Sequence, residues 1–200
     1  MKERVVMQLD ALPMHGRGSD SPTMWGTLAF MLLEGSAFAL CIGIYLYLLV
    51  LAPQWPIGAL PPRWPAGTVM TVLLLASLVP NYLVGRWARE NDLARVRLGM
   101  IIMSVLGIAP LIVRVFEFRS LNVWWDTNAY GSILWLLLGL HSMHIATDVA
   151  DTLVLGVMMF TRHGSNSRRM GDVEDNVLYW NFVVLTWLPI YFCIYWIPRL

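Results

Sequence analysis

Four ionisable residues, His141, His144, Asp148 and Asp151, interrupt a long apolar stretch that extends over residues 130–160. Successive members are 3, 4 and 3 residues apart, and side chains at these spacings share one face of a helix. An ionisable side chain is energetically costly inside a membrane, so it usually faces protein or water and has a task there. The spacing predicts a helix with one polar stripe, whose role depends on what it faces.

The pair His141 and His144 has the i, i+3 spacing at which two imidazoles on one helix can bind a metal ion. A zinc site needs three or four ligands, so Asp148 and Asp151 would have to supply the others. The four side chains are spread over about 15 Å of helix, at about 1.5 Å per residue, and cannot converge on one ion. We therefore expect a polar seam packed against neighbouring helices rather than a metal site formed by this helix alone.

Glu34 lies ten residues into an earlier apolar stretch, about 15 Å deep at about 1.5 Å per residue and so near the bilayer midplane. Small residues that allow close helix approach or leave a cleft follow it: Gly35, Ser36, Ala37 and Ala39. Two interpretations stay open: a protonated or hydrogen-bonded glutamate that ties two helices together, or a site for a lipid headgroup, a proton or another subunit. The two helices would run antiparallel, so we expect Glu34 and His144 to approach each other, directly or through lipid or water.

Glu117 follows Arg114 by three residues, which places both on one helix face at the end of an apolar stretch. This spacing favours an ion pair at the membrane interface, which is weak where it is exposed. The sequence contains no Gly-rich phosphate loop, serine-nucleophile motif or CxxCH haem attachment motif. We therefore expect no catalytic residues on this chain.

A charged cluster precedes the last apolar stretch. Glu174 lies there with Asp172 and Asp175, and carboxylates stabilise a helix N-terminus. Arg168 and Arg169 come just before them on a connecting loop, where they can meet anionic lipid headgroups.

The composition indicates an integral membrane protein. Hydrophobic residues make up 58% of the 200 residues and charged residues 14%, whereas about a quarter of a soluble domain is charged. A formal net charge of +1 without a basic, aromatic-interleaved patch gives no indication of nucleic-acid binding. Cys41 and Cys193 lie in apolar stretches, without a CxxC partner, and are expected to be small core residues. Residues 1–20 are polar and predict no cleavable signal peptide.

Five apolar segments are near or above the length of about 20 residues that a helix needs to cross the hydrocarbon. They are Met24–Leu51, Gly67–Val84, Leu98–Phe116, Ala129–Phe160 and Val177–Ile197. The predicted fold is all-α: a polytopic bundle of five transmembrane helices over residues 24–198, after an N-terminal cytoplasmic tail at 1–23. Ten of the 14 Lys and Arg residues fall on the side of the N-terminal tail, which predicts the N-terminus inside and the C-terminus outside.

Four short motifs occur in order along most of residues 25–196. The first begins with Trp25-Gly26 and ends at Glu34, and the second joins Glu117 to Tyr130-Gly131-Ser132. The third is Gly139-Leu140-His141-Ser142-Met143-His144. The fourth is Glu174 followed by Tyr179-Trp180-Asn181-Phe182 and Trp187. Each motif is weak alone, but four in order with compatible spacing are fairly specific.

These motifs resemble subunit III of the haem–copper cytochrome c oxidases, in a short five-helix bacterial form. The third is similar to that family's Gly-x-His-Gly-x-His helix and the fourth to its Glu…Tyr-Trp-His-Phe…Trp terminal helix. Three positions depart from the pattern and suggest a divergent branch. Asn181 stands where the family usually has histidine, Val184 where it often has aspartate, and Asp148 where it tends to have a small residue.

The resemblance implies a non-catalytic subunit of a proton-pumping terminal oxidase in aerobic respiratory electron transport. Such a subunit carries no haem or copper itself, because these cofactors belong to the catalytic partner subunit. It packs on that subunit, holds phospholipid in a cleft, supports proton uptake and protects the enzyme during turnover. Five positions match the family's polar residues and are expected to share their roles. They are Glu34, Glu117, His141, His144 and Glu174.

The implied location is the inner (plasma) membrane of the cell, as a multi-pass protein among other oxidase subunits. Smaller relatives in the family are linked to nitric oxide reduction, so an accessory subunit of a nitric oxide reductase is one alternative. A second alternative, from another functional class, is an independent transporter of protons or metal ions. It would use the intramembrane stripe on residues 141–151 together with Glu34.

Overall fold

The computed structural model describes residues 21–161, 164 and 167–200, with the side chains of 167 and 168 excepted. All regular structure in these residues is helical. The helices are α1 Pro22–Leu51, α2 Trp64–Arg89, α3 Leu93–Arg119, α4 Ala129–Met159 and α5 Ser167–Tyr191, followed by a π-helical turn at Phe192–Trp196 and a 3₁₀ turn at Ile197–Arg199. Five helical segments are long and apolar enough to cross a membrane, which confirms the all-α, five-span prediction.

The observed helices begin earlier or end later than most of the apolar segments. The largest difference is at α5, which begins at Ser167, ten residues before the predicted Val177. Asp172, Glu174 and Asp175 therefore lie inside α5, and the prediction that they precede the helix is wrong. An apolar segment marks only the part in hydrocarbon, about 30 Å thick. A helix of 31 residues such as α4 is about 46 Å long and continues into the headgroup region.

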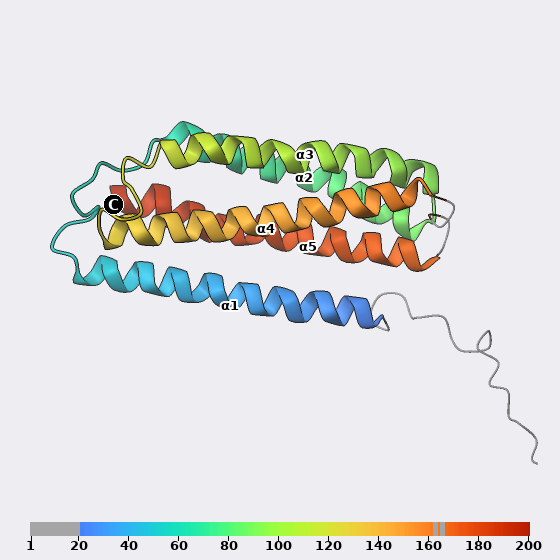
Figure 1. Ribbon diagram of the computed structural model, residues 1–200, viewed down its shortest axis with the longest axis horizontal. Coiled ribbons are helices and arrows are strands. Elements are labelled where there is room, and N and C mark those ends of the chain that lie inside the picture. Colours follow the sequence, from blue (N-terminus) through green and yellow to red (C-terminus); the bar gives the residue numbers. More distant parts are fainter. Residues whose placement is uncertain (1–20, 162–163, 165–166) are drawn as a thin grey trace, which may run out of the picture.

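Four of the helices close a ring. α2 packs on α3, α3 on α4, α4 on α5, and α5 on α2. α1 lies outside this four-helix ring, along the groove between α4 and α5 (Figure 1). Its contact is narrow, because only Phe38, Cys41 and Tyr45 of its residues are buried. The core therefore lies inside the ring, and α1 is an added helix held by one seam.

The connections divide between the two ends of the bundle. The start of α1, the turn between α2 and α3, the end of α4 and the start of α5 lie at one end, here called the N-terminal end. The C-terminus, the connection from α1 to α2 and the connection from α3 to α4 lie at the opposite end (Figure 1). The two ends correspond to the two sides of the membrane between which the Lys and Arg residues were counted. The N-terminal end has more of these residues and is therefore predicted to face the cytoplasm. Most of the predicted tail, residues 1–20, lies outside the described residues.

Glycines bring α3 close to its neighbours. A Cβ atom on Gly107 would lie 2.7 Å from Cγ2 of Val149 on α4, and one on Gly99 would overlap Val84 on α2. Small residues at such positions allow transmembrane helices to pack backbone against side chain. This close approach places the α3 side chains within reach of the polar stripe on α4.

Candidate functional site

The polar stripe of α4 faces protein. His141, His144 and Asp148 are buried, and Asp151, at the end of the stripe, is exposed. The partners of these residues come from α1, α3 and α5. The expected polar seam between helices is therefore present, and it has three separate parts along α4.

The middle part joins α1, α4 and α5 at Glu34. Tyr179 on α5 donates a hydrogen bond from its hydroxyl to Glu34 Oε2 at 2.7 Å. Nε2 of His144 lies 3.0 Å from the same oxygen. This approach is a close contact without hydrogen-bond alignment, because neither ring nitrogen of His144 has a hydrogen-bond partner among the described residues. The prediction that Glu34 and His144 meet is confirmed.

Aromatic rings surround His144 on three sides. The ring centroids of Phe38, Tyr179 and Phe182 lie 5.4, 5.1 and 5.2 Å from that of His144. Phe182 can come this close to α1 because the residue after Glu34 is Gly35, whose Cβ position is 3.4 Å from the Phe182 ring. The Glu34 side chain stays 19% exposed, whereas His144 is almost fully enclosed. The Glu34 side chain thus keeps partial access to the surroundings of the bundle, which the His144 ring lacks.

The second part is a buried network around Arg114 of α3. Arg114 donates from Nη1 to Glu117 Oε2 at 2.5 Å and from Nη2 to His141 Nδ1 at 2.7 Å. Tyr195 donates from its hydroxyl to Glu117 Oε1 at 2.6 Å. Arginine has no acceptor, so Nδ1 of His141 must accept. Nε2 of His141 then carries the hydrogen and donates to the carbonyl of Val183 at 3.1 Å.

The burial of this network corrects an expectation. The Arg114 and Glu117 side chains are only 3% and 0% exposed, so the pair is not an exposed interfacial pair. The guanidinium of Arg114 also lies over the Trp187 ring, 4.6 Å from the ring centroid, and the face of an aromatic ring attracts a cation. A buried ion pair needs hydrogen bonds on its remaining atoms to offset the loss of hydration. His141 and Tyr195 supply two of them.

The third part of the seam lies around Asn176 of α5. Its Nδ2 donates to Asp151 Oδ2 at 3.1 Å and to Asp148 Oδ1 at 3.4 Å. Thr152 donates from its hydroxyl to Asn176 Oδ1 at 3.2 Å. One amide therefore holds two carboxyl groups of α4. The second oxygen of Asp148 is buried and has no hydrogen-bond partner among the described residues.

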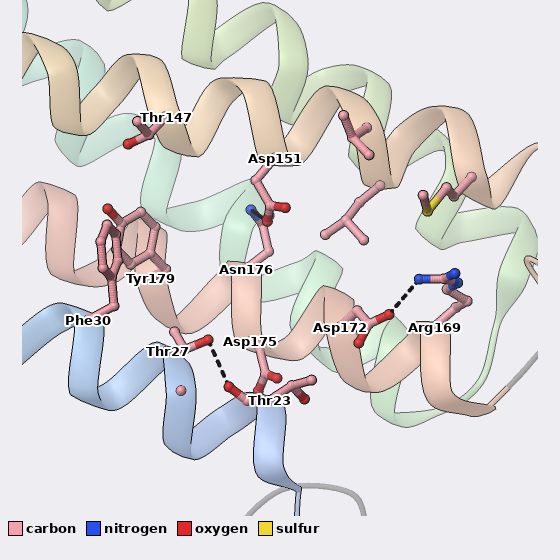
Figure 2. A pocket seen from close by; sticks show the side chains of 14 residues that line it. Thr23, Thr27, Phe30, Thr147, Asp151, Arg169, Asp172, Asp175, Asn176 and Tyr179 are labelled. Carbon is pink, nitrogen blue, oxygen red and sulfur yellow. Dashed lines mark hydrogen bonds and ion pairs between the residues drawn. The ribbon is translucent and has the colours of Figure 1, made fainter. Parts of the chain in front are cut away.

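Beyond Asn176 a cavity of about 510 Å³ opens between α1, α4 and α5 at the N-terminal end of the bundle (Figure 2). Asp151, Asn176 and Tyr179 line it. Tyr179 therefore connects the cavity with Glu34, and Asn176 connects it with Asp148. Arg169 lines the cavity and pairs with Asp172 at 3.0 Å.

Two of the predicted site residues, Glu174 and Asn181, lie apart from these clusters. Glu174 is half-buried on α5 and is not among the residues that line the cavity. Asn181 contacts α2, where Asn81 donates to its Oδ1 at 3.0 Å. The side chain of Arg168 lies outside the described part of the structure.

Sequence reasoning missed Tyr179, Asn176 and Tyr195 as members of the site. Asn176 and Tyr179 are three residues apart on α5 and share a face. This spacing of two polar side chains could have indicated that both belong to the site. Tyr195 gave no signal, because its partner Glu117 is 78 residues away in the sequence. Among the described residues, no group of three or more His, Cys, Asp or Glu side chains is arranged to hold a metal ion.

The family model described as "Cytochrome c oxidase subunit III" matches residues 23–198. The chain is 27% identical to cytochrome c oxidase subunit 3 of Synechocystis sp., over 90% of this chain and 78% of the relative. It is 24% identical to the Thermostichus vulcanus protein of the same name, over 87% of each. It is 27% identical to the Drosophila melanogaster protein, over 86% of this chain and 68% of the relative. With its five membrane-spanning helices and a match along almost its whole length, the chain belongs to the cytochrome c oxidase subunit III family.

Proposed function

We propose that this chain is a non-catalytic membrane subunit of a haem–copper oxidase and that its α1–α4–α5 seam holds phospholipid in the complex. Family membership over residues 23–198 supports the oxidase role. The observation that carries the lipid role is the cavity between α1, α4 and α5, which has both polar and apolar lining residues at one end of the spans. In this role haem and copper belong to the catalytic partner subunit, and the complex couples oxygen reduction to proton translocation.

The outer surface of α1 fits a place among lipid and other membrane subunits. Leu32, Leu33, Leu40 and Val50 are 68% to 82% exposed. An extended apolar surface of this kind marks contact with a membrane or with another protein. The proposed location is the inner (plasma) membrane, with the N-terminal end of the bundle in the cytoplasm.

Copurification tests the oxidase role. A tag on this chain should bring down a haem-containing catalytic subunit from mildly solubilised membranes, in constant ratio through size-exclusion chromatography. Haem absorbance and oxygen consumption should follow the same elution peak. A tagged chain that elutes without haem in every detergent would contradict the proposal.

The same preparation separates the alternatives. Consumption of nitric oxide in place of oxygen by the purified complex would assign the chain to a nitric oxide reductase. Transport of protons or metal ions by the chain reconstituted alone in liposomes would assign it to an independent transporter. We expect neither activity, because the α4 stripe is engaged with α1, α3 and α5.

A further inference from the structure

We propose that the outer surface of α5 binds one transmembrane helix of a partner subunit, with Asn181 as the hydrogen-bond donor near the middle of the membrane. This inference rests on the proposed role as an oxidase subunit and adds the docking surface and the chemistry of the helix that it takes. The surface is here called the outer stripe of α5. It is a row of residues alternately 3 and 4 apart: Leu178, Asn181, Leu185, Leu188 and Phe192.

The outer stripe has the spacing of a seam between two helices. Residues alternately 3 and 4 apart form the row along which helices pack as knobs into holes. Leu185, Leu188 and Phe192 are exposed, and Leu178 and Asn181 are partly exposed. The leucines and the phenylalanine would suit lipid as well as protein, so the amide group in this row decides what covers it.

The two helices beside the outer stripe bound it without covering it. Asn181 is at its edge towards α2, where Asn81 donates to Asn181 Oδ1 at 3.0 Å. Phe182, the next residue, is at the edge towards α1, since its ring lies 3.4 Å from the Cβ position of Gly35. Between these contacts Leu185 is 62% exposed. The face of α5 between α1 and α2 is therefore open to a further helix.

The amide of Asn181 has hydrogens left to donate. Its Oδ1 accepts from Asn81, but Nδ2 carries two N–H donors. Nδ2 has no hydrogen-bond partner in the described part of the chain, and it is not among the enclosed polar atoms. Trp180 of α5 differs, because its Nε1 donates to Ser77 Oγ of α2 at 2.8 Å. Asn181 thus presents donors that the contact between α2 and α5 does not use.

The depth of Asn181 excludes a lipid headgroup as the acceptor. The spanning segment Arg169–Arg199 has its middle at residue 184, so Asn181 is about 5 Å from the middle at about 1.5 Å per residue. Phosphate and ester oxygens of lipid lie at the edges of a hydrocarbon layer about 30 Å thick, about 10 Å further out. Acyl chains have no acceptor, and an unsatisfied amide in hydrocarbon is costly. The acceptor must therefore come from protein at this depth.

The free donors favour another kind of chain over a second copy of this one. Two copies related by a two-fold axis would meet with the same surface on each side, and Asn181 would face an Asn181 whose Oδ1 already accepts from Asn81. A helix of another subunit with a hydroxyl, amide or carboxyl oxygen at mid-membrane offers an unengaged acceptor. One asparagine in a helix seam also fixes register and the number of associating helices, which suits a specific contact in a complex.

Photo-cross-linking of the complex in its membrane tests the docking surface. Leu185→benzoylphenylalanine places a photoreactive group in the outer stripe, four residues from Asn181. The matched control is Val105→benzoylphenylalanine, because Val105 is exposed near the middle of α3. Peptide mass spectrometry should show Leu185 joined to a transmembrane helix of an oxidase subunit that has a side-chain acceptor near its middle. The Val105 position should give lipid products instead.

Two asparagine variants test the hydrogen bond itself. Asn181→Leu removes the donors and should weaken retention of this chain in the complex about three- to tenfold, as expected for one hydrogen bond between membrane helices. Retention is measured as the ratio of this chain to haem after serial dilution in detergent. Asn81→Leu breaks the bond inside the chain but leaves Nδ2 of Asn181 in place. It should lower the thermal stability of the chain and leave retention unchanged.

Equal loss of retention in the two asparagine variants would assign Asn181 a role only within the chain and would overturn the inference. Leu185 products limited to lipid, or to a second copy of this chain, would also overturn it. These failures are separate from failure of the proposed function, because haem still copurifies with the chain. A chain without haem whose Leu185 position is joined to a transmembrane helix with a mid-membrane acceptor would instead support the docking surface and contradict the oxidase role.

Discussion

At the scale of single residues, the ion pair of Arg114 and Glu117 depends on a third residue from another helix. Nη2 of Arg114 is held by Nδ1 of His141, and Nη1 by Glu117. An i, i+3 pair has the same pattern in a sequence whether it is exposed or buried. The sequence could therefore predict the pair but not its burial, which follows from the packing of α3 against α4 and of Tyr195 over Glu117.

Glu117→Gln should destabilise the folded chain by about 3–5 kcal/mol, because it leaves the Arg114 charge buried without a counterion. Thermal release of this subunit from the purified complex, followed by size-exclusion chromatography, would measure the effect. The exposed Glu90→Gln should change stability by at most about 1 kcal/mol. Equal release temperatures for the two variants would show that the Arg114 network does not stabilise the fold.

Glu34 and His144 are a pair that sequence reasoning did predict. Counting residues along the apolar stretches puts both near mid-bilayer on antiparallel helices, and in the structure Nε2 of His144 lies 3.0 Å from Oε2 of Glu34. The hydroxyl of Tyr179 was not predicted, because an aromatic residue in an apolar helix gives no sign that its polar end has a partner.

Glu34→Ala should loosen bound lipid and shorten the working life of the oxidase more than it lowers the initial rate. The carboxyl group is a point at which α1 accepts a hydrogen bond from Tyr179 and lies in close contact with His144. Turnover-dependent inactivation of the purified complex is the measurement. The milder variant Tyr179→Phe removes one donor and should give a smaller effect in the same direction. Inactivation kinetics unchanged from the native complex would contradict a protective role.

At the scale of helices, glycine positions decide how closely neighbours approach. Gly107 of α3 faces Val149 of α4 at a distance that leaves no room for a methyl group, whereas Gly26 of α1 faces open space. The sequence showed that small residues are present, but the facing residue on the other helix becomes known only from the structure.

Gly107→Ala and Gly26→Ala form a matched pair for this packing. Both gain about 1 kcal/mol of helix propensity. Only Gly107→Ala must displace Val149, at a cost of about 1–3 kcal/mol for overpacking. We expect the first variant to lower the thermal stability of the complex relative to the second. A Gly107→Ala complex at least as stable as the Gly26→Ala complex would mean that α4 yields easily at this contact.

The start of α5 shows the limit of apolar patterns for helix ends. Val177 is where the apolar segment begins, but the helix already starts at Ser167. Polar residues such as Asp172 are compatible with a helix outside the hydrocarbon, so hydropathy alone cannot mark this boundary. The cavity was missed for the same reason, because its acidic wall lies on this additional part of α5.

At the scale of the whole molecule, the number of spans was predictable and the packing order was not. Apolar length alone gave five crossings. The closed ring of α2, α3, α4 and α5 depends on contacts such as Asn81 with Asn181, 100 residues apart, and no pattern in the sequence indicates that these two residues pair.

Orientation in the membrane can be tested by cysteine labelling. Cys41 and Cys193 are buried, so the native chain should give little background with a membrane-impermeant maleimide. Glu90→Cys, at the N-terminal end of the bundle, should be labelled only from the cytoplasmic side, and Trp124→Cys, at the opposite end, only from outside. The reverse pattern would show that the distribution of Lys and Arg misassigns the topology.

The position of α1 has a consequence for exchange of material with the bilayer. Since the other four helices enclose the core by themselves, the first helix can swing aside on its narrow line of attachment while the remainder keeps its shape. An amphiphile lodged behind it could then leave sideways into the surrounding leaflet, and a fresh molecule could replace it without unfolding the subunit or detaching it from its assembly.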